Sequence, residues 1–421
     1  MSRLGKKRSR WGRRVSIGLT GSVVATLGLW IAIHEIPGFG PALAEGVRSV
    51  VGPGPVAWAE DVAYGLQDRV NLWRFKDSKP KAFWDEPQST NTPTSGAGVA
   101  MQAADRQGVE TQPRGAGSGG SSSAAGFPPA AFEPPFSNVA GEGDGKWIRM
   151  TDPARPAEVG LAKSVVHPDP KRSFAAIAVV AIDLRRVDVR LMAGTTEPTS
   201  TTVPRESRPG LVPPSAMGDL IAVFNGGFRA MHGHYGMMIA GSTFLPPRDI
   251  ACTVAFHRDG SIRIGTWAAV KGGEADMLVY RQTPPCLVED GTVNKTLGYD
   301  EYNRNWGAAV GGETIIRRSA IGVDATGSVV FYGLGEAVTA PALARGMKAA
   351  GAHGVAQLDV NYSYPRFLLY ESKSPTEPKR ASSALIKDIK FTSYEYVAEP
   401  SPRDFFYLAW RSSEPPPHPS L

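Results

Sequence analysis

The sequence places flexible and polar residues at the end of a predicted strand, where they could bind an anion. The apolar run Ile221–Phe224 leads directly into Asn225, Gly226 and Gly227. A strand that ends in Asn-Gly-Gly exposes backbone N–H groups that no side chain covers, and such a turn can form an anion-binding nest. The alternative is a plain β-turn without a ligand, which the sequence favours for an isolated Asn-Gly-Gly.

Two histidines follow in the same glycine-rich stretch. His232 and His234 are one residue apart, so on a strand both rings would point to one face, as in some metal sites. No third ligand stands nearby at a suggestive spacing, and we therefore expect neither a metal nor another cofactor. A single histidine that donates a hydrogen bond to a substrate is favoured over a metal site.

A pair of arginines begins another predicted strand. Arg317 and Arg318 lead into an apolar run that ends at Asp324. The planar guanidinium of arginine suits bidentate recognition of phosphate. Adjacent arginines can equally well face solvent without a ligand.

A carboxylate stands at the end of a third strand. The apolar run Val355–Leu358 ends at Asp359, and Asn361 and Ser363 follow closely. A carboxylate in this position is a candidate general base or nucleophile. The alternative is an aspartate that caps the strand or stabilises a turn.

Short β-type runs would position these residues. Three hairpins are predicted from Gly-containing turns between such runs: Cys252–Phe256 with Ile262–Thr266, Cys286–Val288 with Thr292–Val293, and Ile321–Asp324 with Val329–Tyr332. Two more apolar runs, Phe174–Leu184 and Val187–Ala193, predict an early strand pair. A helix is predicted to start after Thr339, with Pro341 in its first turn, and to stop at Gly351. The fold class is therefore α+β, with a mixed, mostly antiparallel sheet and a few packed helices.

The chain has two cysteines, Cys252 and Cys286, which are too few for a disulfide scaffold. One bridge between them is expected if the domain lies outside the cytoplasm, and two buried thiols are the alternative. The sequence does not decide between the two, because it does not show whether their Cα atoms lie within bonding reach.

The N-terminal residues predict a membrane anchor. Val15–Ile33 contains nineteen residues without a charge, and residues 1–14 carry seven basic residues and no acid. At about 1.5 Å per residue the run approaches the ~30 Å hydrocarbon core of a bilayer. Because positive residues stay in the cytoplasm, we expect the rest of the chain to be extracytoplasmic. A cleaved signal peptide, with a site at Ala42–Ala44, is the alternative.

The charge distribution argues against nucleic-acid binding. The net charge of +6 falls to −1 when the N-terminal tail with its +7 is left out. A nucleic-acid-binding domain needs a basic face that neutralises phosphates. The charge total gives no support for such a face.

The remaining segments are predicted from composition. Residues 34–76 form a juxtamembrane segment with an amphipathic helix at 55–76 that rests on the membrane, rests on the domain, or is simply solvated. Residues 77–135 are rich in Ser, Gly, Pro, Thr and Ala and read as a disordered linker. The domain then spans 146–411, and 412–421 is a disordered tail.

Taken together, these motifs resemble the phosphodiester glycosidase domain family. The resemblance covers roughly 146–410 and follows the order of the family's blocks: Asp183-Leu184, Asn225–Phe228, Pro285–Gly291, Arg318–Asp324 and Leu358-Asp359. The family usually has L-D-G-G-G-S where this chain has Leu358-Asp359-Val360-Asn361-Tyr362-Ser363, and this difference indicates a divergent branch.

The resemblance implies cleavage of a sugar-1-phosphodiester, here from a bacterial cell-envelope polysaccharide. It implies a catalytic group made of Asp359, His234 and Arg318, in which the carboxylate serves an oxocarbenium-like centre as in other glycosidases. Substrate binding is assigned to Asn225, Gly226, Gly227, Asn361, Ser363 and Asp324. The lost glycines leave a second hypothesis open, a non-catalytic protein that binds an anionic polysaccharide or a partner in the same cleft. A third, weaker hypothesis is a metal-dependent hydrolase that uses His232 and His234.

Overall fold

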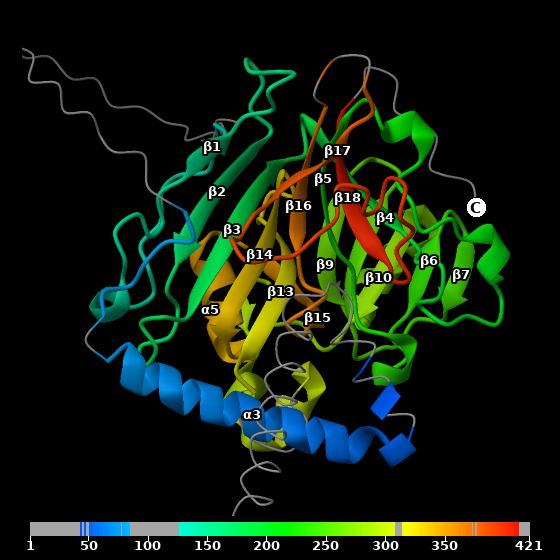
Figure 1. Ribbon diagram of the computed structural model, residues 1–421. Helices are drawn as coiled ribbons and strands as arrows, with labels where there is room; N and C mark the ends of the chain where they lie inside the picture. Colours follow the sequence, from blue (N-terminus) through cyan, green and yellow to red (C-terminus); the bar gives the residue numbers. More distant parts are fainter. Residues whose placement is uncertain are drawn as a thin grey trace, which may run out of the picture.

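The computed structural model describes residues 43, 46–47, 50–76, 78–84, 126–307, 314–372, 374 and 377–411. These residues form one long helix and three antiparallel sheets (Figure 1). The predicted cytoplasmic tail 1–14, the anchor 15–33 and the C-terminal tail 412–421 lie outside the described residues. Within the described residues, no helix is both long enough and apolar enough to span a membrane.

The largest sheet has the strand order β1-β2-β3-β14-β13-β15-β11-β12. Its strands are β1 (Ile148–Met150), β2 (Leu161–Val166), β3 (Ala176–Asp183), β11 (Val288–Glu289), β12 (Thr292–Val293), β13 (Ile316–Val323), β14 (Val329–Val338) and β15 (Gly354–Val360). Every pair of neighbouring strands in it is antiparallel.

Two five-stranded sheets complete the β structure. The first has the order β7-β6-β10-β8-β9, with β6 (Met237–Ile239), β7 (Ser242–Leu245), β8 (Cys252–His257), β9 (Ile262–Thr266) and β10 (Met277–Thr283). The second has the order β17-β16-β5-β18-β4, with β4 (Val187–Met192), β5 (Leu220–Asn225), β16 (Phe367–Glu371), β17 (Arg380–Ala384) and β18 (Phe405–Trp410).

Three α-helices have bounds that lie within the described residues. They are α3 (Pro53–Arg74), α4 (Trp267–Val270) and α5 (Ala340–Ala349). Short 3-10 turns lie at Ser137–Val139, Arg205–Ser207, Pro214–Ala216, Ala230–His232, Lys271–Asp276, Lys295–Gly298 and Asp300–Trp306. The hydroxyl oxygen of Thr339 accepts a hydrogen bond from the Ala342 N–H, so the predicted N-cap of α5 is confirmed.

Strand β3 shows where the cores lie, because both of its faces are buried. Its residues Ala178, Val180 and Ile182 face the main core, which the two five-stranded sheets share. The alternate residues, from Ile177 to Ala181, face a second core that is covered by α5. A strand buried on both faces reads as one continuous apolar run, which is why the sequence marks it so clearly.

Most predicted elements are confirmed. The three hairpins form as β8–β9, β11–β12 and β13–β14. The two early strands also form, but they do not pair with each other: β3 lies in the eight-stranded sheet and β4 lies beside β18. The α+β class with mostly antiparallel sheets is therefore confirmed for the described residues.

The predicted disordered linker 77–135 is wrong at both ends. Phe83 and Trp84 pack against the main core, and the Lys163 ammonium lies 4.4 Å from the centre of the Trp84 ring. At the other end, Phe132 packs on Trp147 with ring centres 5.7 Å apart. These aromatic side chains provide the apolar contacts that the surrounding Gly- and Ser-rich composition lacks.

Candidate active site

Three strand ends meet where the eight-stranded sheet adjoins the sheet that contains β5. The N–H of Asp359, near the end of β15, donates to the carbonyl oxygen of Gly226 just after β5, at 3.2 Å. Strand β18 pairs with β5 from Phe405 opposite Asn225, so the residues before β18 arrive at the same point. Residues far apart in the sequence are therefore brought together by sheet pairing.

Asp359 is buried, with 3 % of its surface exposed. One carboxylate oxygen lies 2.5 Å from the Nη2 atom of Arg403, and the Asn361 amide lies 3.5 Å from the same oxygen. Burial raises the pKa of this carboxyl above its usual value, although the positive charge of Arg403 acts in the opposite direction. The result is a desolvated carboxylate with one cationic partner.

Arg403 connects Asp359 with the turn after β5. Its Nη2 atom also donates to the Gly227 carbonyl oxygen at 3.3 Å, and its guanidinium lies 4.0 Å from the centre of the Tyr364 ring. Its side chain is 14 % exposed, whereas that of Asp359 is 4 % exposed. The cation is therefore the more accessible member of the pair.

The Asn-Gly-Gly turn is not an open anion nest, and this prediction is corrected. The Gly226 N–H donates to the Asp404 backbone carbonyl, and the Gly227 N–H donates to the Asp404 carboxylate, both at 2.9 Å. The Asn225 N–H donates to the Arg366 carbonyl oxygen. All three N–H groups thus bind the protein itself, and a Cβ atom at Gly226 would lie 2.2 Å from the Asp404 carboxylate.

Asp404 is in turn paired with Arg281 on β10. The Arg281 Nε atom donates to Asp404 at 2.8 Å, and both side chains are at most 1 % exposed. Tyr364 adds a hydrogen bond from its hydroxyl to the Asp404 carbonyl oxygen at 2.7 Å. We call Asp359, Arg403, Asp404, Arg281 and Tyr364 the junction cluster. It contains two aspartate–arginine pairs next to each other, which fix the geometry of the three strand ends.

Asn225 is buried completely and holds neighbouring strands together. Its amide donates to the Ser319 hydroxyl at 2.8 Å, and its side-chain oxygen accepts from the Tyr332 hydroxyl at 2.8 Å. The Ser319 hydroxyl donates to the Asp359 carbonyl oxygen at 2.9 Å. Asn225 therefore positions the junction cluster instead of contacting a substrate.

Arg318 also differs from its predicted role. It is 2 % exposed, and its guanidinium donates to the backbone carbonyl oxygens of Val338, Trp306 and Thr314. It donates in addition to the Gln357 side chain. A guanidinium enclosed by carbonyl oxygens in this way is arranged to hold the backbone, so the structure does not place Arg318 where it would meet a phosphate.

Asp324 lies at the other end of the sheet. In the register of β13 and β15, Arg318 is opposite Val360, whereas Val323 is opposite Gly354. At about 3.3 Å per residue, the six steps between Gly354 and Val360 correspond to roughly 20 Å. The Asp324 carboxylate accepts from the N–H groups of Ser328 and Val329 in the β13–β14 turn. Asp324 is therefore a turn residue and is not brought to the junction cluster.

The two remaining polar residues after β15 shape a turn. The Asn361 side-chain oxygen accepts from the N–H groups of Ser363 and Tyr364, at 2.9 and 2.6 Å. Ser363 is exposed. Both residues lie close to Asp359 in the chain, so their predicted role in substrate binding stays a prediction.

His232 and His234 lie on the loop that follows the Asn-Gly-Gly turn, and both are exposed. His234 has a positive φ of 49° and sits in a turn, not on a strand, so the strand geometry assumed for the two rings does not occur. In the described part of the chain, no group of three or more potential ligands is placed to hold a metal ion. A proton-transfer role for His234 stays a prediction.

Sequence reasoning missed Arg403 and Asp404, which lie immediately before β18. A signal was present, because a charged pair directly precedes the apolar run Phe405–Trp410. In an antiparallel sheet the start of one strand lies beside the end of its neighbour, so both positions reach the same edge.

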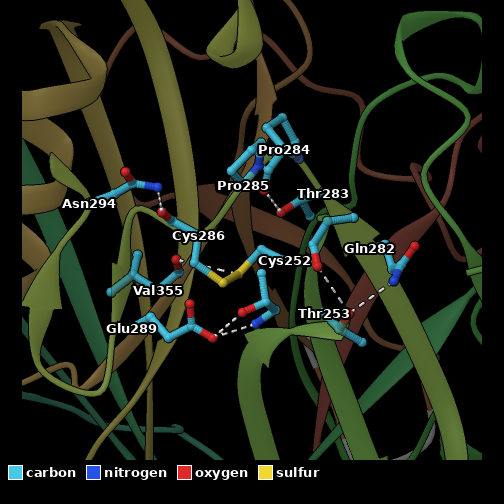
Figure 2. The surroundings of a disulfide bond; sticks show 12 residues. Cys252, Thr253, Gln282, Thr283, Pro284, Pro285, Cys286, Glu289, Asn294 and Val355 are labelled. Carbon is cyan, nitrogen blue, oxygen red and sulfur yellow. Dashed lines mark hydrogen bonds between the residues drawn. A yellow bond between two sulfur atoms is a disulfide. The ribbon is translucent and has the colours of Figure 1, made fainter. Parts of the chain in front are cut away.

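A disulfide bond joins Cys252 to Cys286, with Cα atoms 4.6 Å apart (Figure 2). Cys252 begins β8, and Cys286 lies just before β11, so the bond connects two different sheets. Asn294 donates to the Cys286 carbonyl oxygen at 3.0 Å and holds the second cysteine in place. Of the two alternatives that the sequence left open, the structure supports the bridge.

The chain was compared with known proteins. Solved structures that are similar to this chain include the following two. One is the catalytic domain of zebrafish N-acetylglucosamine-1-phosphodiester alpha-N-acetylglucosaminidase, auto-inhibited by its pro-peptide. Its sequence is 14% identical to this chain, and the TM-score is 0.39. The match covers 63% of this chain and 88% of that chain. A hypothetical protein from Synechocystis is 11% identical, with 60% and 62% covered and a TM-score of 0.36. No curated protein matches the chain. Residues 218–359 match the family model described as phosphodiester glycosidase, so the resemblance to this family is confirmed over that segment.

Proposed function

We propose that this domain hydrolyses a sugar-1-phosphodiester between the anomeric carbon and the phosphate oxygen. The observation that carries the proposal is the buried ion pair of Asp359 and Arg403 at the meeting point of three strand ends. The family match over 218–359 supports it, because that segment contains both the turn after β5 and Asp359.

The negative charge of Asp359 suits the sugar side of the broken bond, and the positive charge of Arg403 suits the phosphate side. A glycosidic bond to phosphate breaks through an oxocarbenium-like state, which a nearby carboxylate such as Asp359 stabilises or attacks. The leaving phosphomonoester carries negative charge, which an arginine such as Arg403 stabilises. Since a phosphomonoester has a second pKa near ~6, it needs little help from a general acid. His234 is the candidate for that limited help, and Asn361 and Ser363 are candidates for orienting the sugar.

In the proposed mechanism, Arg403 has the phosphate-stabilising role that the sequence analysis assigned to Arg318. The Arg403 guanidinium is partly exposed and contacts the Asp359 carboxylate directly, whereas that of Arg318 is enclosed by backbone carbonyl oxygens. In the proposed reaction a bound phosphate would draw Arg403 away from Asp359 and leave the carboxylate free to act.

We also propose that the enzyme is a bacterial membrane protein whose domain acts outside the cytoplasm on a cell-envelope polysaccharide. The charge pattern of residues 1–33 supports this orientation. The disulfide between Cys252 and Cys286 supports an oxidising compartment, where such bonds form and persist.

Turnover by the purified full chain, measured on a sugar-1-phosphodiester, tests the proposal. We expect Asp359→Asn and Arg403→Gln each to lower kcat/KM by roughly 100-fold or more, the scale of a lost acid–base or charge-stabilising group. Asp324→Asn is the matched control, because its carboxylate lies at the far end of the sheet, and it should keep the activity of the original chain. Equal rates for the original chain and Asp359→Asn would overturn the proposed mechanism.

One observation favours a second function, binding without turnover. Where the family has glycines, this chain has side chains: Val360 packs against the group that contains Phe228, and the ring of Tyr362 lies 5.6 Å from that of Tyr64 on α3. These contacts add bulk beside Asp359. Retention of an anionic polysaccharide by the purified chain, without release of free sugar or phosphate, would identify this function.

A further inference from the structure

Helix α3 carries a stripe of large apolar side chains that face away from the protein. Five of them recur at intervals of three or four residues: Trp58, Val62, Leu66, Val70 and Trp73. Between 50 % (Val70) and 80 % (Trp73) of each residue's surface is exposed. Residues at this spacing lie on one face of an α-helix. We call these five residues the outer stripe.

The opposite face of α3 is fixed to the domain at successive turns. The ring of Tyr64 contacts that of Tyr362, and the ring of Phe75 lies 5.5 Å from that of Phe174. Between them, Asp68 receives two hydrogen bonds from the Arg172 guanidinium, at 2.9 and 3.0 Å. Figure 1 shows α3 lying along one end of the sheets. The outward direction of the stripe is therefore set by contacts on the other side of the helix.

Basic residues gather at the C-terminal end of the stripe. Residues 69–81 contain five basic residues and one acid. Beside them lies a hollow of about 540 Å³ between α3 and the domain, lined by Lys76, Lys79 and Lys171 together with Leu72, Phe75 and Phe174. None of the residues that line it belongs to the junction cluster. Exposed lysines around an apolar floor suit an anionic amphiphile, that is, the phosphate head and first methylenes of a lipid.

The two tryptophans lie near the ends of the stripe, where they match the preference of this residue for the membrane interface. Nineteen residues, 34–52, separate the uncharged run Val15–Ile33 from Pro53. Nineteen residues reach at most about 65 Å when fully extended. A helix tied to a membrane anchor by so short a connection stays within reach of the bilayer surface.

We propose that α3 is an interfacial helix that lies in the headgroup region of an anionic bilayer, with the outer stripe directed toward the acyl chains. This inference rests on the proposed membrane anchor. Because α3 contacts Tyr362, three residues after Asp359, a helix held in the membrane surface also holds the junction cluster at a fixed height above it. The substrates that reach the cluster are then those that lie close to the bilayer.

The depth of a single label on the full chain tests the proposal. Both cysteines of the chain are joined in the disulfide, so an introduced cysteine is the only free thiol. An environment-sensitive fluorophore is attached to Leu66→Cys on the outer stripe. The matched control is Ser383→Cys, which is exposed on β17. Figure 1 shows β17 at the opposite end of the molecule from α3. Each protein is reconstituted in nanodiscs of phosphatidylglycerol and phosphatidylcholine that carry a quencher on the acyl chains.

We expect the label on Leu66→Cys to be quenched several-fold more than the label on Ser383→Cys. The difference should shrink in discs of phosphatidylcholine alone and after Lys76→Gln with Lys79→Gln. Equal quenching of the two labels in anionic discs overturns the proposal. Shielding of the Leu66→Cys label that grows with protein concentration, without lipid quenching, also overturns it and identifies a second copy of the chain as the partner.

Three measurements separate this inference from the proposals on which it rests. Retention of the full chain in the disc tests the anchor, label depth tests α3, and release of sugar tests the hydrolase. A chain that is retained, but whose Leu66→Cys label stays in water, overturns the interfacial helix alone. A chain that is not retained, with the label in water, overturns both the helix and the anchor.

Discussion

At the scale of single residues, the junction cluster combines two aspartates that have different surroundings. Asp404 is paired with Arg281 and also accepts hydrogen bonds from the backbone, so it is fully committed to structure. Asp359 has Arg403 as its cationic partner and lies nearer to the exposed turn formed by residues 361–363. The same residue type therefore holds the site together at Asp404 and, in the proposed mechanism, carries chemistry at Asp359.

Because Asp359 is buried, we expect the pH dependence of kcat/KM to be shifted to higher pH. Burial raises the pKa of Asp359 above the ordinary 3.8, and the charge of Arg403 opposes this rise. If the ionised carboxylate is the active form, kcat/KM increases with pH through a pKa higher than that of an exposed aspartate. Arg403→Gln should move this acidic limb to still higher pH, which a purely structural arginine would not do. Profiles of the two proteins that share one acidic limb would contradict the pairing.

The same pKa shift has a consequence for stability. The folded chain binds the Asp359 proton more tightly than the unfolded chain does. Between the unfolded and the folded pKa, the folded state is therefore protonated while the unfolded state is not, and this contribution to stability decreases as the pH rises. The stabilising effect is complete below the unfolded pKa and is lost above the folded one.

Arg318 provides a prediction about stability. Arg318→Gln removes a donor from the buried carbonyl oxygens of Val338 and Thr314, while the Trp306 oxygen keeps its hydrogen bond from Gln357. Each buried group left unsatisfied costs about 1–3 kcal/mol. We expect the free energy of unfolding, measured in urea, to fall by at least about 2 kcal/mol. Arg155→Gln is the control, because Arg155 and its partners Glu158 and Asp219 all have partly exposed side chains, and such surface pairs contribute about 0–1 kcal/mol. A large loss of activity without loss of stability would instead support a catalytic role for Arg318.

At the scale of elements, the disulfide is the covalent link between two sheets. It ties the start of β8 to the segment before β11 and closes a loop with a sequence separation of 34 residues. Within the described residues, β8 pairs with β9 and β10 of its own sheet, and no backbone pairing links it to the eight-stranded sheet. The bond therefore fixes how the sheets are placed next to each other.

Loss of this bond should destabilise the domain measurably. The loop-closure entropy for a loop of this length corresponds to about 3–4 kcal/mol. We expect Cys252→Ser combined with Cys286→Ser to lower the Tm by several degrees, and reductant to lower the Tm of the original chain to a similar extent. Reductant should leave the Tm of the double variant unchanged. A Tm of the original chain that does not respond to reductant would show that the bond is absent in solution.

The elements also show which features can be read from the sequence. Gly260, Gly291 and Gly327 mark turns that are complete within a few residues, so their hairpins are visible locally. The N-cap at Thr339 is local for the same reason. The hydrogen bonding of the Asn-Gly-Gly turn depends on a distant residue, because Asp404, which accepts from the Gly227 N–H, lies 177 residues further along the chain. The N–H groups of Gly226 and Gly227 look free to bind a ligand when only the sequence is considered, but in the fold they already donate hydrogen bonds to Asp404.

At the scale of the whole molecule, the net charge is distributed unevenly, with a basic N-terminal tail before a nearly neutral remainder. The seven basic residues of 1–14 precede the apolar run, and the remaining chain has a net charge of −1. The structure adds α3, which faces the domain on one side and presents the outer stripe on the other. With the proposed anchor, these features would give the molecule one side that faces the membrane.

This arrangement predicts the topology of the chain in cells. We expect a peptide tag after Leu421 to be degraded when protease is added to intact spheroplasts, whereas a tag at residue 1 is protected until the cells are lysed. The physical reason is that basic residues next to an apolar span remain in the cytoplasm. Protection of both tags would contradict an extracytoplasmic domain.

The position of β18 in its sheet determines when, during synthesis of the chain, this sheet can form completely. This strand is the last in the described chain, yet it lies between β5 and β4 in the interior of its sheet. A polypeptide is made from its N-terminus, so β4 and β5 exist long before the strand that separates them. Until residues 405–410 have been synthesised, this sheet has a gap, and the Asp404 that closes the Asn-Gly-Gly turn is missing. A chain that stops before residue 403 therefore lacks both Arg403 and Asp404, although Asp359 is already present.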